Sequence, residues 1–193
     1  MKRILTISFL VFMITPAFAR DMNGKFGLGL EASTGGVSGL QFSYFINVVK
    51  LELTLGSNIF IPEKGDTAFG FYSTPGLIAE LVQAPNANLG VGLKANLGYR
   101  NKAAQGNGYS VFEASIEVPI EGEYFLSNHF GIHFSVGFLF DIVPKGGRAM
   151  NPMESSKLNG GKSSDGSSSD KKGFGIYLGA GSFSGSAGFT FYF

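Results

Sequence analysis

The sequence predicts an all-β protein, an antiparallel up-and-down β-barrel of eight strands. Large apolar residues alternate with small or polar residues in eight successive segments, and the connections between the segments differ in length on the two sides. Charged residues make up 15% of the 193 residues, which include 29 glycines and 20 phenylalanines. A soluble domain has about a quarter of its residues charged, so the composition indicates an unusual environment.

The alternation is clearest in FGIHFSVGFLFDI, residues 130–142, where every second residue is large and apolar. Successive side chains of a strand point to opposite faces, so this segment has one apolar and one polar face. The same pattern predicts strands over residues 26–30, 40–46, 49–55, 68–82, 89–99 and 112–120. Pro75 interrupts the fourth of the eight segments, and we expect a bulge there because proline cannot donate a ladder hydrogen bond.

Residues 173–193 supply the eighth strand. Their apolar phase changes near Ser182, which a bulge with one extra residue would explain. We expect one long bulged strand, and two shorter strands are the alternative. Two strands would give nine in total and would break the even count that places both termini on one side.

The connections alternate in length along the chain. The second, fourth and sixth are short, whereas the third, fifth and seventh are long. The seventh, residues 144–172, is rich in serine, glycine and lysine, and we expect it to be a mobile loop. Short turns on one side and longer external loops on the other are typical of outer-membrane barrels.

The first nineteen residues have the three parts of a secretory signal peptide: a basic start, an apolar run and the small-residue end Ala17-Phe18-Ala19. The apolar run is shorter than the roughly 20 residues of a membrane-spanning helix. We expect cleavage after Ala19 and one domain over residues 20–193. The chain has no cysteine for disulfides, and its net charge of +1 gives no indication of nucleic-acid binding.

Alternation alone does not say which face is outside, since a soluble periplasmic lipid-binding barrel would hold its apolar face inside. The polar face here consists mostly of glycine and serine with scattered charges, whereas a water-facing surface is rich in charge. Most segments also approach or exceed the 9–11 residues of a tilted membrane-spanning strand. The inverted arrangement, with the apolar face toward lipid, is therefore favoured.

The chain ends in GFTFYF, which resembles the C-terminal signal recognised by the barrel assembly machinery, with Gly188, Phe191 and Phe193 at the matching positions. Residues 123–138 look like the penultimate hairpin of many such barrels. The chain thus resembles the small eight-stranded outer-membrane class (OmpA, OmpX, OmpW and Opa-like proteins), without a periplasmic domain. This resemblance implies a monomer in the outer membrane of a Gram-negative envelope, in contact with outer-membrane lipids and lipopolysaccharide.

The polar face would line the interior of such a barrel, and its charged residues are the candidate functional set. Six acids stand against three bases and one histidine: Glu31, Lys50, Glu52, Glu80, Lys94, Arg100, Glu113, Glu117, His133 and Asp141. An eight-stranded barrel is just wide enough to be filled by side chains, and buried charges must be paired. We expect a salt-bridge network that plugs the interior; the alternative is a narrow porin-like pore that favours cations.

Other activities have weaker support. His133, Ser135 and Asp141 share a face, but the first two are about 7 Å apart along a strand, too far for a nucleophile and its base, so we expect no catalytic residue. No convincing metal cluster or phosphate loop is present, and we expect no cofactor. Residues 144–172 hold six basic and three acidic residues, which suits contact with lipopolysaccharide phosphates or an external partner.

Overall fold

The computed structural model describes residues 20–63, 65–105, 110–143, 173–177 and 183–193. The expected signal peptide, residues 1–19, and the expected loop, residues 144–172, lie outside these ranges. The described regular structure is β-strand apart from one four-residue helix, α2 (Lys102–Gln105). No helix in the described ranges is long and apolar enough to cross a membrane.

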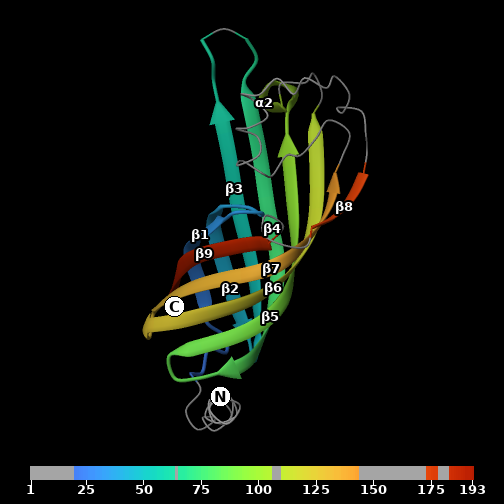
Figure 1. Cartoon of the computed structure of the whole chain (residues 1–193). Helices are drawn as coiled ribbons and strands as arrows, with labels where there is room; N and C mark the ends of the chain where they lie inside the picture. The colour runs from blue at the N-terminus through green and yellow to red at the C-terminus, as the bar shows by residue number, and fades with distance from the viewer. Residues whose placement is uncertain (1–19, 64, 106–109, 144–172, 178–182) are drawn as a thin grey trace, which may run out of the picture.

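The strands form one closed sheet. They are β1 (Phe26–Ser33), β2 (Gly39–Ile46), β3 (Val49–Phe60), β4 (Ala68–Gln83), β5 (Ala87–Arg100), β6 (Val111–Ser127), β7 (Phe130–Val143), β8 (Gly173–Tyr177) and β9 (Phe183–Tyr192). Each strand from β1 to β6 pairs antiparallel with the next. Strand β9 pairs with both β7 and β1, which closes the barrel (Figure 1). The predicted eight-stranded antiparallel barrel is confirmed.

Strands β8 and β9 together fill the eighth position of the barrel. Both pair with β7, with Tyr177 opposite Leu139 and Phe183 opposite the adjacent Phe138. The expected single strand is therefore wrong in detail, because two paired segments follow one another along β7. Five residues, 178–182, separate them and lie outside the described ranges. An odd number of intervening residues accounts for the change of apolar phase, since side chains alternate with a period of two.

The bulge expected at Pro75 is in a different place. Pro75 pairs with Leu53 of β3 in unbroken register, and the register toward β5 is the same before and after it. Pairing with β5 lapses at Thr74 and Pro75, and Pro75 has no N–H to donate there. The register shift lies between Glu80 and Val82, near the C-terminal end of β4.

The two ends of the barrel differ as the sequence predicts. Two residues join β2 to β3 and two join β6 to β7, whereas residues 61–67 join β3 to β4 and residues 101–110 join β5 to β6. Asn47, in the first of these short turns, has a φ of 54°, a conformation that asparagine tolerates better than most residues. In Figure 1 the short turns are at the lower end of the barrel, and α2 and the tall β3–β4 hairpin are at the upper end. We call these the turn end and the loop end.

The burial of side chains is inverted relative to a water-soluble protein. Among the described residues, 31 large hydrophobic side chains are exposed, and 20 polar or charged residues are buried against 7 hydrophobic ones. In β1, for example, Leu28 and Leu30 are exposed while Glu31 is buried. No charged residue occupies an outward-facing position in the described parts of β1 to β7 and β9. The barrel therefore presents an apolar outer wall around a polar interior.

Candidate functional site

The centre of the interior is an ion network around two lysines. The Lys50 ammonium lies 3.0 Å from a carboxylate oxygen of Glu52 and also contacts Glu121. The Lys94 ammonium lies 2.7 Å from the other oxygen of Glu52 and 3.1 Å from Glu121. Glu52 and Glu121, on β3 and β6, thus bridge lysines on β3 and β5, and the network ties strands across the interior rather than only along one ladder.

Two further carboxylates extend this network. Glu123 lies 3.2 Å from Lys50 and accepts a hydrogen bond from the Tyr192 hydroxyl. Glu31 lies 3.5 Å from Lys94 and accepts one from Thr54. The six ionic side chains of the network are at most 5% exposed. Charges this deeply buried must be paired, and each lysine here meets three carboxylates.

The turn end of the interior is closed by an apolar plug. Phe45, Phe125 and Tyr192 pack together, with ring centroids 5.8 Å apart for Phe45–Tyr192 and 5.9 Å for Phe125–Tyr192. Met22, from the segment before β1, is buried in the same cluster. The Arg20 guanidinium covers the outer side of this plug, 4.6 Å from the centre of the Phe125 ring.

Hydrogen-bonded amides and hydroxyls fill the interior between the ion network and the loop end. Thr74 donates to the Asn96 side-chain oxygen at 2.7 Å, and the Asn96 amide nitrogen lies 3.4 Å from Glu117. Val37 and Val111 are buried above them. Side chains from the turn end to the loop end therefore occupy the described interior.

The interior holds more carboxylates than bases. Seven glutamates are buried in the described part of the chain: Glu31, Glu52, Glu80, Glu113, Glu117, Glu121 and Glu123. The buried lysines are Lys50 and Lys94, and the half-buried Arg100 stands at the loop end. One oxygen of Glu80 and both ring nitrogens of His133 are buried without a hydrogen-bond partner among the described residues. Such atoms require water, protons or counter-ions.

The structure brings most of the predicted site residues to one place. Eight of the ten are buried in the interior: Glu31, Lys50, Glu52, Glu80, Lys94, Glu113, Glu117 and His133. Arg100 is half-buried at the loop end, away from the ion network. Asp141 pairs with Ser115 in the β6–β7 ladder, and its side chain lies outside the described part of the structure.

Sequence reasoning missed Glu121 and Glu123 as interior residues. It ended the sixth strand at residue 120, whereas β6 continues to Ser127. The signal was present, because Ile120, Gly122 and Tyr124 carry on the outward phase while the glutamates between them carry on the inward phase. Pro119 in the middle of this run suggests that the strand ends there. Proline is accommodated because Pro119 lies where the pairing of β6 with β5 lapses, so its missing N–H is not needed for a ladder hydrogen bond.

The His133–Ser135 pair has no catalytic geometry. Ser135 forms its 2.8 Å hydrogen bond with Ser186 on β9, and no described residue bonds to either nitrogen of His133. Within the described residues, no group of three or more histidine, aspartate or glutamate side chains is arranged to hold a metal ion.

The fold and the interior together define a closed eight-stranded antiparallel barrel with an apolar outer wall. No protein-family model and no curated protein matches the sequence. Among solved structures, the chain is similar to Ail, the attachment invasion locus protein of Yersinia pestis, at 12% identity with a TM-score of 0.39. The match covers 89% of this chain and 100% of that chain. At this level of similarity, the assignment of the barrel rests on the strand pairing described above.

Proposed function

We propose that the protein is a monomeric integral outer-membrane barrel with a structural or surface-interaction role and a plugged interior. The inverted burial carries this proposal, because water would not tolerate an apolar wall that surrounds the whole barrel. In a lipid bilayer the same wall is favourable, and the pairing of β9 with β1 closes the sheet, which a lipid environment requires because an open edge could not be satisfied there. Because β9 pairs with both β7 and β1, the part of the barrel they form offers no free strand edge with which a second copy of the chain could pair, which supports a monomer.

The distribution of outward aromatic residues supports a membrane belt. Phe26, Tyr44, Tyr124 and Phe191 lie near the turn end of their strands and are 43–49% exposed. Phe69, Phe71 and Phe112 lie near the loop end. The mid-strand outward positions between them are mainly aliphatic, among them Leu53, Leu93, Ile120 and Val136. Aromatic girdles that flank an apolar band are typical of transmembrane barrels.

The plugged interior argues against the two alternative functions. A lipid-binding soluble barrel needs an apolar cavity, whereas the interior here is lined by ionic and amide side chains. A pore needs a continuous path, whereas the Phe45, Phe125 and Tyr192 plug covers the turn end. A planar bilayer recording tests the second alternative: we expect insertion without current steps. Discrete steps that change when Glu113 and Glu117 become glutamine would make the interior a conducting path.

The remaining parts of the proposal concern maturation and partners. We propose that the signal peptide, residues 1–19, directs export and that Gly188, Phe191 and Phe193 are read by the assembly machinery. The outer wall would contact outer-membrane lipids, and the basic loop 144–172 would contact lipopolysaccharide phosphates or an external partner. We assign no catalytic role to any residue.

Cell fractionation combined with a denaturing gel tests the proposal. The protein should be in the outer-membrane fraction, and unboiled samples should run faster than boiled ones because the barrel stays folded in detergent. Recovery in the soluble periplasmic fraction, with no difference between boiled and unboiled samples, would contradict it.

A further inference from the structure

The loop end of the barrel contains a pocket that the plugged interior does not include. Strand β2 pairs with β3 only as far as Leu55, while β3 continues to Phe60 and β4 begins at Ala68. The β3–β4 hairpin therefore rises above the β1–β2 connection (Figure 1). Where they meet is a pocket of about 180 Å³, lined by Gly36, Val37, Ser38, Ser57, Asn58, Tyr72 and Arg100.

Arg100 is held in place within this pocket. Its Nε donates a 2.8 Å hydrogen bond to the Tyr72 hydroxyl, and its guanidinium carbon is 6.0 Å from the centre of the Tyr72 ring. The same hydroxyl accepts a 3.2 Å hydrogen bond from the Asn58 amide nitrogen. These contacts fix the guanidinium through one nitrogen, so less conformational freedom remains to be lost when a ligand binds.

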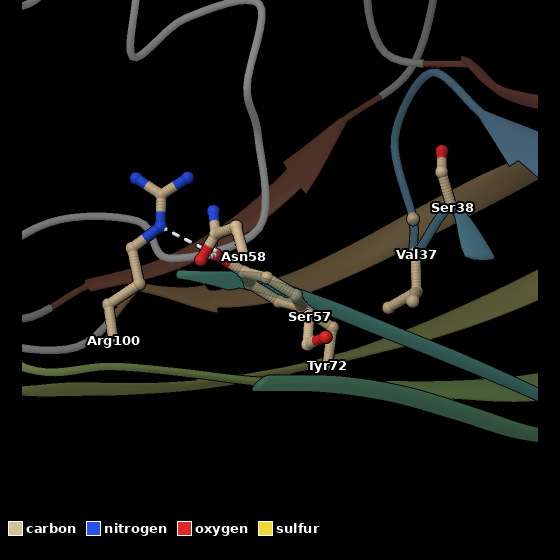
Figure 2. Close-up of a pocket in the computed structure, with 7 residues that line it drawn as sticks. Val37, Ser38, Ser57, Asn58, Tyr72 and Arg100 are labelled. Carbon is tan, nitrogen blue, oxygen red and sulfur yellow. Dashed lines mark hydrogen bonds between the residues drawn. The ribbon is translucent and has the colours of Figure 1, made fainter. Parts of the chain in front are cut away.

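Among the described residues, the hydrogen bond of the Arg100 side chain is the one from Nε to Tyr72, and no described residue bonds to its two terminal nitrogens. Figure 2 shows them pointing away from Tyr72. By contrast, the two lysines at the centre of the interior, Lys50 and Lys94, each meet three carboxylates. Arg100 therefore differs from the network lysines: it is a positioned cation with N–H donors to which no described residue bonds.

The chemistry and size of the pocket suit a compact anion. A guanidinium presents parallel N–H donors that match the two oxygens of a carboxylate. The Asn58 amide and the hydroxyls of Ser38 and Ser57 line the same space. The volume is below the roughly 300–1,000 Å³ of pockets for drug-sized ligands, so it fits a small acid or the acidic end of a longer molecule.

We propose that this pocket binds a carboxylate group, with Arg100 as its anchor and Tyr72 as the residue that positions Arg100. Access from the cell exterior rests on the proposed function, because only an inserted barrel turns its loop end outward. The binding itself can be measured on the folded barrel alone, so the two proposals fail separately.

The test uses the full mature chain folded in detergent micelles, with folding verified for each sample by the gel shift. The side-chain Nε–H signal of Arg100 is followed by NMR during titration with acetate, glucuronate, glucose and inorganic phosphate at constant ionic strength. We expect saturable binding of acetate and glucuronate and none of glucose. Tighter binding of glucuronate than of acetate would identify an acidic sugar as the source of the carboxylate, and equal binding a simple acid.

Variants separate the pocket from general charge effects. Arg100→Gln should weaken carboxylate binding at least tenfold. Arg100→Lys, which keeps the charge but loses the parallel N–H donors of the guanidinium, should also weaken it. Tyr72→Phe should weaken it by about threefold or more, while Lys102→Gln, a charge change on the adjacent α2, should leave it within twofold. If Arg100→Gln fails to fold, the other variants still decide the matter.

Three results would overturn the proposal. A folded wild-type barrel that does not bind acetate or glucuronate would remove the site. Equal binding by wild type and the Arg100 variants would show that Arg100 does not anchor the ligand. Tighter binding of phosphate than of both carboxylates would show that the pocket does not select a carboxylate. A chain that shows no folded barrel in micelles or vesicles would instead contradict the proposed function.

Discussion

Replacing one outward-facing leucine in the middle of the barrel wall with arginine tests whether the wall faces lipid or water. Leu93 is the seventh residue of the fourteen-residue strand β5 and is 50% exposed. At the bilayer midplane, arginine on the lipid face of a barrel costs about 2–4 kcal/mol, falling to about 0–1 kcal/mol near the interface. Leu93→Arg should therefore lower the folding equilibrium constant about 30- to 900-fold.

The same change on a water-facing surface would have almost no effect. Surface substitutions of soluble proteins are usually within about 0.5 kcal/mol of neutral. Ile61→Arg is the matched control, because Ile61 is 76% exposed but lies beyond the end of β3. It should cost no more than about 1 kcal/mol.

The assay is reversible urea unfolding in lipid vesicles, followed by the folded and unfolded bands on an unboiled gel, since the chain has no tryptophan for fluorescence. The difference between Leu93→Arg and Ile61→Arg is the decisive quantity. A difference below about 0.5 kcal/mol would refute the assignment of the outer wall to lipid.

Two further predictions concern the interior. Lys50→Met removes the cation that Glu52, Glu121 and Glu123 share, leaves Glu123 without a basic partner among the described residues and leaves Glu52 and Glu121 with Lys94 alone, so it should destabilise the folded barrel by about 3–5 kcal/mol. Lys25→Met, outside the network, should change stability by less than about 0.5 kcal/mol; equal effects would mean that the network adds nothing to stability. Gly188→Ala places a Cβ 2.6 Å from the Cε1 atom of His133, even closer to its Nε2 atom, and against the Leu30 carbonyl oxygen of β1, so purified protein should lose about 1–3 kcal/mol. Full stability in vesicles with failed assembly in cells would instead assign the glycine to recognition alone.

The alternation of the sequence was sufficient to predict the barrel, its strand count and the side on which the longer loops lie. Each of these depends on local pattern. Alternation with a period of two assigns residues to the two faces of a strand, and the lengths of the connections distinguish the two ends of the barrel. Eight of the ten proposed interior residues needed no more than this, because facing direction is a property of the strand itself.

Features that depend on pairing between strands could not be predicted in the same way. Glu52 and Glu121 meet Lys50 and Lys94 because the curvature of the closed barrel brings β3, β5 and β6 together across the interior. The shift near Glu80 belongs to the pairing of β4 with β5, and no single residue in the sequence marks it. The Arg100 pocket depends on β2 ending before β3, which alternation within either strand does not show.

Cysteine labelling tests the central claim, an apolar wall that faces lipid, most directly. The chain has no cysteine of its own, so Leu93→Cys and Val136→Cys each introduce a single reporter on the outward face, and Ile61→Cys is the control beyond the strands. In folded vesicles, a charged water-soluble maleimide should label Ile61→Cys but not the other two, whereas after unfolding in urea it should label all three, because the thiolate that reacts forms only where water is present. Labelling of Leu93→Cys and Val136→Cys by the charged reagent in the folded barrel would contradict the account.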